Sequence, residues 1–259
     1  MGNAVLAIQD LTYSWPGQRE PLFGSITSSF EGGLITTVLG SNGSGKTTFL
    51  NVLARRLPQS AGSLQLDGRS PTVRDFNYML QEPSRLLFPH LTLQQNINLR
   101  RVNVSRERGH LPTLLEALFQ DARVLDSYPS HCSGGQRQRA VLARAIGEIA
   151  AFPVTLLDEP FAQISQDVKP RIYRCLRETV RQSGCVVLMV THDVAEALIV
   201  GDQAVVISAE GLQAFDASSI TNNSEYLAAS DLRNAVHRAL FQRSASQGPN
   251  STVPKASAS

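Results

Sequence analysis

Three mainly apolar runs stand out along the chain, and each one ends at glycine or at polar and charged residues. The runs are residues 34–39, 154–157 and 186–190. Apolar runs of this length are typical of strands that are buried on both faces of a parallel sheet. Helical patterns follow the first run at residues 47–56 and precede the third run at residues 168–182. Strands that alternate with helices predict an α/β protein with a mostly parallel sheet.

Shorter patterns predict additional strands and a helical region. The expected strands are residues 5–8 with 11–13 at a sheet edge, 62–66, 76–80, and a terminal hairpin of 203–207 with 212–215. Residues 91–148 are mostly helical in pattern and are rich in Leu, Arg and Gln. The sequence therefore predicts an antiparallel β edge and a helical subdomain beside the parallel sheet.

The chain divides into one large domain and a tail. We expect residues 1–220 to form the domain, with the helical subdomain at about 84–150. Residues 221–243 have an amphipathic pattern that predicts a C-terminal helical extension. Residues 244–259 are rich in Ser, Ala and Pro, and this composition predicts disorder.

Composition restricts the class of protein further. The chain of 259 residues is 42% hydrophobic and 18% charged, which is ordinary for a soluble globular protein. Its net charge of +2 argues against nucleic acid as a partner, because such proteins usually carry a concentrated basic face. The three cysteines lack metal-ligand spacing, which predicts reduced thiols in a cytosolic protein. We expect no signal peptide and no membrane helix, because the apolar runs fall far short of the ~20 residues needed to cross a membrane.

The polar segment after the first strand predicts a phosphate-binding loop. It consists of Gly40, Ser41, Asn42, Gly43, Ser44, Gly45, Lys46, Thr47 and Thr48. Glycines let backbone N–H groups curl around an anion, and a helix that begins near Lys46 adds the positive end of its dipole. In such a loop the lysine reaches the β- and γ-phosphates of a nucleotide, and the Thr47 hydroxyl holds Mg²⁺. The alternative is a chance glycine turn, which would match in roughly one chain per hundred of this length.

Two acidic residues and a histidine follow the other two buried strands. Ligands gather at the carboxyl ends of strands in open parallel sheets, so we expect Asp158 to hold Mg²⁺ directly or through water. Glu159 would act as general base for the water that attacks the γ-phosphate. His192 would donate a hydrogen bond to the γ-phosphate or orient that water. The alternatives are acids that only cap a turn and a histidine with a structural role.

A second helix start is the other candidate anion site. Ser133-Gly134-Gly135-Gln136 precedes a helical pattern that runs towards Ile149. Free N–H groups and a serine hydroxyl at a helix start attract anions. The alternative is a helix that is merely capped by its serine.

The order of these motifs resembles that of the ATP-binding subunit of ABC transporters. Residues 40–48 are similar to the Walker A motif, Gln81 to the Q-loop, 132–136 to the signature motif, 154–160 to Walker B, and His192 to the switch histidine. The resemblance covers roughly residues 3–216 and implies the P-loop NTPase fold with an ABC-type ATPase core. In this family an aromatic ring at the position of Tyr13 stacks on adenine, whereas a buried tyrosine at a sheet edge is the alternative.

The resemblance also implies an activity and a set of partners. It implies an ATPase that binds ATP and Mg²⁺ between two head-to-tail subunits, in a homodimer or heterodimer. Ser133, Gly135 and Gln136 of one subunit would contact the ATP held by the other. Gln81 would contact Mg²⁺ and the attacking water, and would connect to the segment that touches the membrane partner. The other partners would be permease subunits and a solute-binding protein, with this chain peripheral on the cytoplasmic face of the cell membrane.

Two positions depart from the family pattern. Cys132 replaces the usual leucine of the signature, and we expect its side chain to pack rather than contact phosphate. Ser165 stands where an aspartate usually helps to couple the two ATP sites. Because Glu159 is present, we expect hydrolysis to survive while communication between the sites is weakened.

The loop at residues 81–92 resembles that of importers for nitrate, sulfonates and taurine, with an inserted Ser84. Its apolar patch at residues 86–91 predicts a docking surface for a partner, or else a cover for the helical subdomain. The rival functions are a soluble ABC-type ATPase of DNA repair or translation, a subunit that binds ATP without hydrolysing it, and an exporter or lipid-transport subunit. The chain has no heptad pattern and no second phosphate loop, which argues against the first rival.

Overall fold

The computed structural model of the protein describes residues 2–80, 86–99, 111–208 and 211–216. Its strands are β1 (Val5–Tyr13), β2 (Phe23–Glu31), β3 (Ile35–Leu39), β4 (Ala61–Leu66), β5 (Phe76–Met79), β6 (Val154–Asp158), β7 (Val186–Val190), β8 (Gln203–Ser208) and β9 (Gly211–Asp216). Its α-helices are α1 (Lys46–Leu53), α2 (Leu93–Ile97), α3 (Leu111–Leu118), α4 (Gly134–Gly147), α5 (Lys169–Ser183) and α6 (Val194–Val200). Short 3₁₀ turns are η1 (Val73–Asp75), η4 (Ala122–Asp126), η5 (Pro129–His131) and η6 (Ile149–Ala151).

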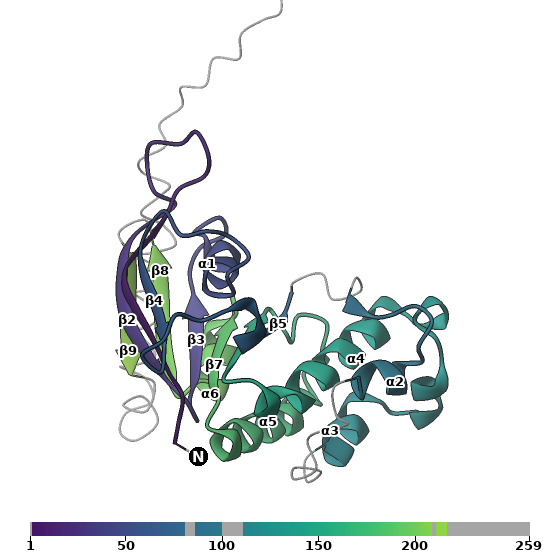
Figure 1. The fold of residues 1–259 in the computed structure, drawn as a ribbon. Helices are drawn as coiled ribbons and strands as arrows, with labels where there is room; N and C mark the ends of the chain where they lie inside the picture. The colour runs from purple at the N-terminus through teal and green to yellow at the C-terminus, as the bar shows by residue number, and fades with distance from the viewer. Residues whose placement is uncertain (1, 81–85, 100–110, 209–210, 217–259) are drawn as a thin grey trace, which may run out of the picture.

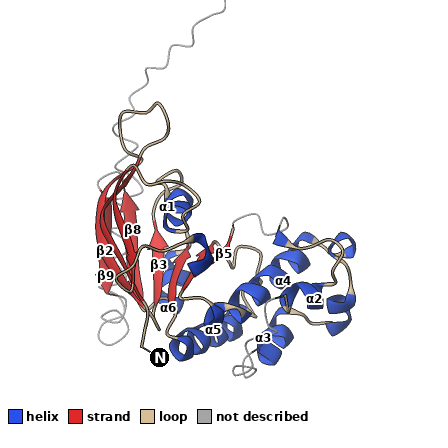
Figure 2. Cartoon of the chain, viewed as in Figure 1, coloured by secondary structure: helices blue, strands red, loops and turns tan. Residues whose placement is uncertain are grey.

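The strands form two sheets, which lie on the same side of the molecule (Figures 1 and 2). The larger sheet has the order β5-β6-β7-β3-β8-β9, and all of its neighbours are parallel except the β8–β9 hairpin. In its register, Val190 of β7 is paired with both Val38 of β3 and Asp158 of β6. The carboxyl ends of these three strands are therefore neighbours at one edge of the sheet.

The large sheet separates two hydrophobic cores because successive side chains of a strand point to opposite faces. Leu188 and Val190 of β7 belong to the core that contains α1 and the small antiparallel sheet. Val187 and Met189 belong to the core that contains α4 and α5. A strand buried on both faces has no polar face, which explains the continuous apolar runs in the sequence.

The helices α2, α3 and α4 extend away from the sheets (Figure 1). Helix α4 connects this group to the core, since Ile146 and other apolar residues near its C-terminus pack in the same cluster as β7. No helix in the described ranges combines the length and the hydropathy needed to cross a bilayer. The domain boundaries given above remain predictions, and residues 221–259 lie outside the described part of the chain.

The α/β fold class and the mostly parallel sheet are confirmed, but the small sheet differs from the prediction. β1 is the central strand of the order β2-β1-β4 rather than an edge strand. Strand β2 was missed because its buried residues, Phe23, Ile26 and Phe30, do not follow a period of two. The register of β1 also shifts after Ile8.

Candidate functional site

The loop between β3 and α1 is a tightly curled turn. Gly43 has a φ of +78°, a conformation that residues with a Cβ rarely adopt. A Cβ on Gly40 would lie 2.6 Å from the Ser44 hydroxyl oxygen and 2.7 Å from the Ile207 carbonyl oxygen. Both glycines are therefore required by the backbone geometry, as the phosphate-loop prediction expects.

Lys46 lies within this curl. Its Nζ donates to the carbonyl oxygens of Gly40 and Ser41, each at 2.9 Å. Burial lowers the pKa of the Lys46 ammonium, whereas the neighbouring carboxylates of Glu159 and Asp158 oppose this change. The cation is thus held at the centre of the loop, in surroundings that strengthen its attraction for an anion.

Asp158 ends β6 next to the same loop. The residue is 1% exposed, and neither carboxylate oxygen has a hydrogen-bond partner within the described residues. Burial raises the pKa of Asp158, while the adjacent Thr47 hydroxyl and, more weakly, Lys46 oppose the rise. A buried carboxylate without a partner is costly, and a bound cation would satisfy it. The hard oxygen donors of Asp158 and Thr47 fit Mg²⁺.

Glu159 and His192 form a hydrogen-bonded pair at the ends of adjacent strands. Nδ1 of His192 lies 3.2 Å from Oε1 of Glu159. The Glu159 backbone has a φ of +47°, which is uncommon for a residue with a side chain. His192 is 64% exposed at its side chain and Glu159 is 21% exposed, so both remain accessible from solvent.

Lys46, Thr47 and Glu159 line one cavity of about 350 Å³, whereas Asp158 and His192 are not among its walls. Its walls are formed by Trp15, Leu22, Asn42, Gly43, Gly45, Lys46, Thr47, Thr48, Glu159 and Val190. The structure thus brings together the phosphate loop and Glu159, which are more than a hundred residues apart in sequence.

The aromatic residue of this cavity is Trp15 rather than Tyr13. Tyr13 is only 4% exposed and packs in the core, with its ring 5.2 Å from that of Trp15 in a T-shaped contact. Trp15 is 41% exposed. A ring that stacks on a ligand needs an open face, which Trp15 has and the buried Tyr13 lacks in this structure, so Tyr13 remains a prediction and Trp15 is a second candidate for this contact. The Trp15-Pro16-Gly17 turn was the signal in the sequence, because a residue beside a turn is more exposed than one within a strand.

The second anion-site candidate lies at the start of α4, and it contributes no wall to the cavity of the phosphate loop. Ser133 and Gln136 form a capping box: the Gln136 N–H donates to the Ser133 hydroxyl oxygen at 3.2 Å, and Gln136 Oε1 accepts the Ser133 N–H at 2.8 Å. A Cβ on Gly135 would meet only the Arg139 guanidinium, at 3.9 Å. One subunit therefore holds two separate candidate sites.

The two departures from the family pattern also have clear positions. Cys132 is 8% exposed, and its Sγ donates to the Tyr128 carbonyl oxygen at 3.3 Å, so the expectation that it packs is confirmed. Ser165 is exposed in the turn before α5. Gln81, predicted to contact Mg²⁺ and water, lies outside the described residues.

Known proteins match the part of the chain that carries the motifs described above. The family model described as "ABC transporter" matches residues 23–162. The sulfate/thiosulfate import ATP-binding protein CysA of Synechococcus elongatus is 39% identical over 186 residues, which are 69% of this chain and 53% of that protein. The thiamine import ATP-binding protein ThiQ of Photorhabdus laumondii is 32% identical over 213 residues, which are 78% of this chain and 86% of that protein.

A third relative is the Fe(3+) ions import ATP-binding protein FbpC 2 of Rhizobium meliloti, 33% identical over 76% of this chain. The chain spans 53% of the length of that protein, as it does for the Synechococcus relative. Among solved structures, an ATP-binding subunit of an ABC transporter superposes with a TM-score of 0.73 at 22% identity, covering 90% of this chain and 99% of that one. A dimeric ATP-binding cassette bound to ADP and Pi superposes with a TM-score of 0.68 at 21% identity, covering 82% and 98%. These structural matches support the ABC-type ATPase fold.

Proposed function

Because the chain belongs to the ABC transporter family, we propose that it is an ATP-binding and ATP-hydrolysing subunit that powers solute import through partner permeases. One observation carries this proposal. Lys46 of the phosphate loop, the Asp158 carboxylate and the Glu159–His192 pair lie at the adjacent carboxyl ends of β3, β6 and β7, and the Asp158 oxygens have no hydrogen-bond partner in the part of the chain that the structure describes.

The residues around the cavity have distinct roles in holding the nucleotide. We assign the phosphates to Lys46 and the N–H groups of residues 40–48, and the adenine ring to the open face of Trp15. Thr47 and Asp158 would hold Mg²⁺, which neutralises charge on the phosphates when it is bound. Lys46 already lies inside the loop, so little rearrangement is needed when a phosphate enters.

Glu159 and His192 would perform the proton chemistry. A carboxylate that is only partly exposed is suited to accept a proton from water. Its hydrogen bond to His192 orients Glu159 towards the cavity, and the imidazole remains available to donate to the terminal phosphate. In this assignment Glu159 is the general base and His192 is the group that orients the reactants.

The start of α4 would act on a nucleotide held by a second subunit. Ser133, Gly135 and Gln136 do not line the phosphate-loop cavity of their own chain, and this supports a role across a head-to-tail dimer. A structurally similar cassette was solved as a dimer bound to ADP and Pi, which supports a dimer as the working form. Either a second copy or a similar subunit would serve as the partner.

The permease would dock near Phe88. This side chain is 48% exposed and lies edge-on to His90, with the ring centroids 5.9 Å apart. The fully buried Asn96 holds the segment by accepting from the Phe88 N–H at 2.7 Å and donating to its carbonyl oxygen at 3.1 Å. An exposed aromatic ring whose backbone is held by hydrogen bonds is suited to a partner interface.

The names of the relatives support an importer that acts at the membrane. The similar proteins are named for import of sulfate or thiosulfate, thiamine and Fe(3+). We therefore propose import of a small solute at the cytoplasmic face of the membrane, with a solute-binding protein in the same system. The nitrate, sulfonate and taurine branch remains a prediction from residues 81–92.

The Glu159→Gln variant tests the proposed function. It keeps the shape of the side chain but removes the base, so we expect hydrolysis to fall about a thousandfold while ATP stays bound and the dimer accumulates. Phosphate release and size-exclusion chromatography with ATP measure the two effects. The control is Glu116→Gln, an equal change of charge at an exposed residue of α3. Hydrolysis at the normal rate in the Glu159 variant would contradict the assignment of Glu159 as the base. Separately, if the wild-type protein purifies without two hydrophobic membrane proteins, a soluble ATPase would be favoured over a transporter subunit.

A further inference from the structure

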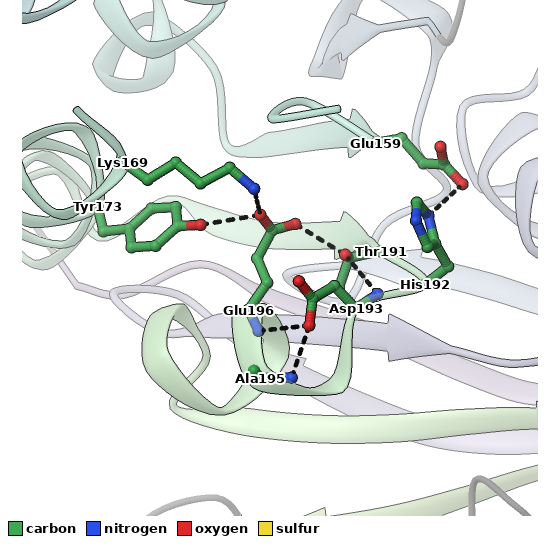
Figure 3. A network of polar contacts seen from close by, with 8 residues as sticks. All are labelled: Glu159, Lys169, Tyr173, Thr191, His192, Asp193, Ala195 and Glu196. Carbon is green, nitrogen blue, oxygen red and sulfur yellow. Dashed lines mark hydrogen bonds and ion pairs between the residues drawn. The ribbon is translucent and has the colours of Figure 1, made fainter. Parts of the chain in front are cut away.

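A buried acidic residue lies directly behind the Glu159–His192 pair. Glu196 of α6 is 6% exposed and accepts three hydrogen bonds from side chains (Figure 3). Its Oε1 accepts from Lys169 Nζ at 2.9 Å and from the Tyr173 hydroxyl at 2.8 Å. Its Oε2 accepts from the Thr191 hydroxyl at 2.7 Å. The carboxylate therefore links the first turns of α5 to the end of β7.

The Thr191 hydroxyl continues this chain of bonds around His192. Thr191 Oγ1 accepts from the backbone N–H of Asp193 at 3.1 Å, so that a short ring closes over the backbone of His192 (Figure 3). Asp193 then caps α6, because its Oδ1 accepts from the N–H groups of Ala195 and Glu196 at 2.8 and 3.2 Å. The backbone on both sides of His192 is thus fixed by hydrogen bonds, and the Glu196 carboxylate orients one of the groups that form them, the Thr191 hydroxyl.

Stability alone is a weak reason for this arrangement. A buried ion pair such as Lys169–Glu196 often adds nothing compared with apolar residues of similar volume, because both charges lose their hydration. The bonds are directional, however, and they fix geometry in a way that apolar packing does not. Burial and the Glu196 carboxylate raise the pKa of Tyr173, which keeps its hydroxyl a donor.

The network also borders the reactive pair. A second cavity of about 210 Å³ is lined by Glu159 and His192 on one side and by Thr191, Lys169 and Glu196 on the other. The His192 side chain can rotate into this open space, since it is 64% exposed and its side-chain hydrogen bond within the described residues is the one to Glu159. Its direction therefore depends on how firmly its backbone is held.

We propose that Glu196 is a positioning residue for nucleotide hydrolysis, which acts through Thr191 to hold His192 towards Glu159. In this proposal Glu196 acts through the Thr191 hydroxyl, to which it is hydrogen-bonded, rather than on the nucleotide. This inference rests on the proposed function, since it assigns a support to the same site. Lys169 and Tyr173 fix the opposite oxygen of the carboxylate, so the turn that carries His192 is tied to α5.

A double-mutant cycle on the full chain with its membrane partners tests the proposal. Glu196→Gln has one acceptor oxygen instead of two, and we expect kcat to fall about tenfold with KM for Mg-ATP unchanged. In the His192→Ala background the same change should cost no more than about twofold, because the group it positions is gone. An equal loss in both backgrounds would overturn the proposal, and so would a raised KM with a normal kcat.

A pair of threonine variants gives an independent test if the Glu196 variant does not fold. Thr191→Val removes the hydroxyl that links Glu196 to the His192 turn. Thr37→Val is the matched control, because it removes a buried hydroxyl that donates to the Gln203 carbonyl oxygen at 3.1 Å. We expect a similar lowering of Tm in both, but a loss of kcat in Thr191→Val alone. Equal kcat values would overturn the proposal. A wild-type complex that hydrolyses no ATP would instead refute the proposed function, and the inference with it.

Discussion

The starts of α1 and α4 are both candidate phosphate sites, but their polar groups are satisfied in different ways. Helix α1 begins after Gly45, which has no side chain to cap it, and the neighbouring Ser44 hydroxyl is buried without a partner in the described residues. Helix α4 begins after Ser133, whose capping box with Gln136 satisfies N–H groups internally. The first start leaves donors free for a ligand, whereas the second must exchange its own bonds for new ones.

This difference indicates that the two sites would have different functions, one in binding the nucleotide and the other in its hydrolysis. A start with free donors and a preorganised lysine binds an anion without rearrangement, although the empty site costs stability. A self-capped start is stable alone and gains little from a ligand until another subunit brings one close. We therefore expect the loop at 40–48 to determine affinity for the nucleotide, and the start of α4 to determine whether the bound nucleotide reacts.

The largest effect is expected for Lys46→Ala. The phosphates lose their nearest cation, and the carbonyl oxygens of Gly40 and Ser41 lose their donor, so ATP affinity should fall at least about a thousandfold, in line with loss of a buried charge pair. Equilibrium titration with a fluorescent ATP analogue measures this. Arg123→Ala is the control, since it removes an exposed cation elsewhere. Undiminished affinity in the Lys46 variant would contradict the site.

Ser133→Ala tests whether the start of α4 affects the rate of ATP hydrolysis without affecting the affinity for ATP. Loss of the cap should lower the free energy of unfolding by about 1 kcal/mol, and the rate of hydrolysis should fall about a hundredfold because a contact to the terminal phosphate is lost. ATP binding by the isolated chain should not change. The matched control is Thr92→Ala, which breaks an equivalent capping box on α2. If both variants hydrolyse ATP at the same rate, the start of α4 has only a structural role.

Trp15→Ala tests whether the nucleotide base stacks on Trp15 beside the phosphate loop at residues 40–48. Loss of a stacked ring should weaken ATP binding about tenfold, which corresponds to the usual ~1–3 kcal/mol of base stacking. Trp15→Phe should restore most of the affinity. Isothermal titration calorimetry measures both, with Tyr13→Leu as the comparison because it removes an aromatic ring that is buried in the core. A larger loss of affinity in the Tyr13 variant than in Trp15→Ala would reverse the assignment.

The smallest effect is expected for Ser165→Asp. If the serine weakens communication between the two ATP sites, restoring the aspartate should raise the turnover of the assembled dimer about twofold, a coupling of less than 1 kcal/mol. Ser165→Ala is the control and should behave as the wild type. Steady-state ATPase assays measure the change, and an unchanged or lower rate would remove this explanation.

Local pattern predicted the parts of the site that lie on continuous strands. Asp158 and His192 follow apolar runs, and the neighbouring order of β6, β7 and β3 brings the ends of those runs together. The burial of Tyr13 could not be predicted in this way, because its ring packs against Phe23 of β2 and β2 has no regular period. The contacts of Glu196 depend on α5, α6 and β7 meeting in space, and no spacing in the sequence indicates them.

The left-handed backbone of Glu159 sets activity against thermostability. A residue with a side chain in this conformation costs of order 1 kcal/mol, and glycine would remove that cost together with the carboxylate. Directed evolution for heat resistance alone would therefore favour the loss of this residue. A screen that also requires turnover would retain it and accept the strain.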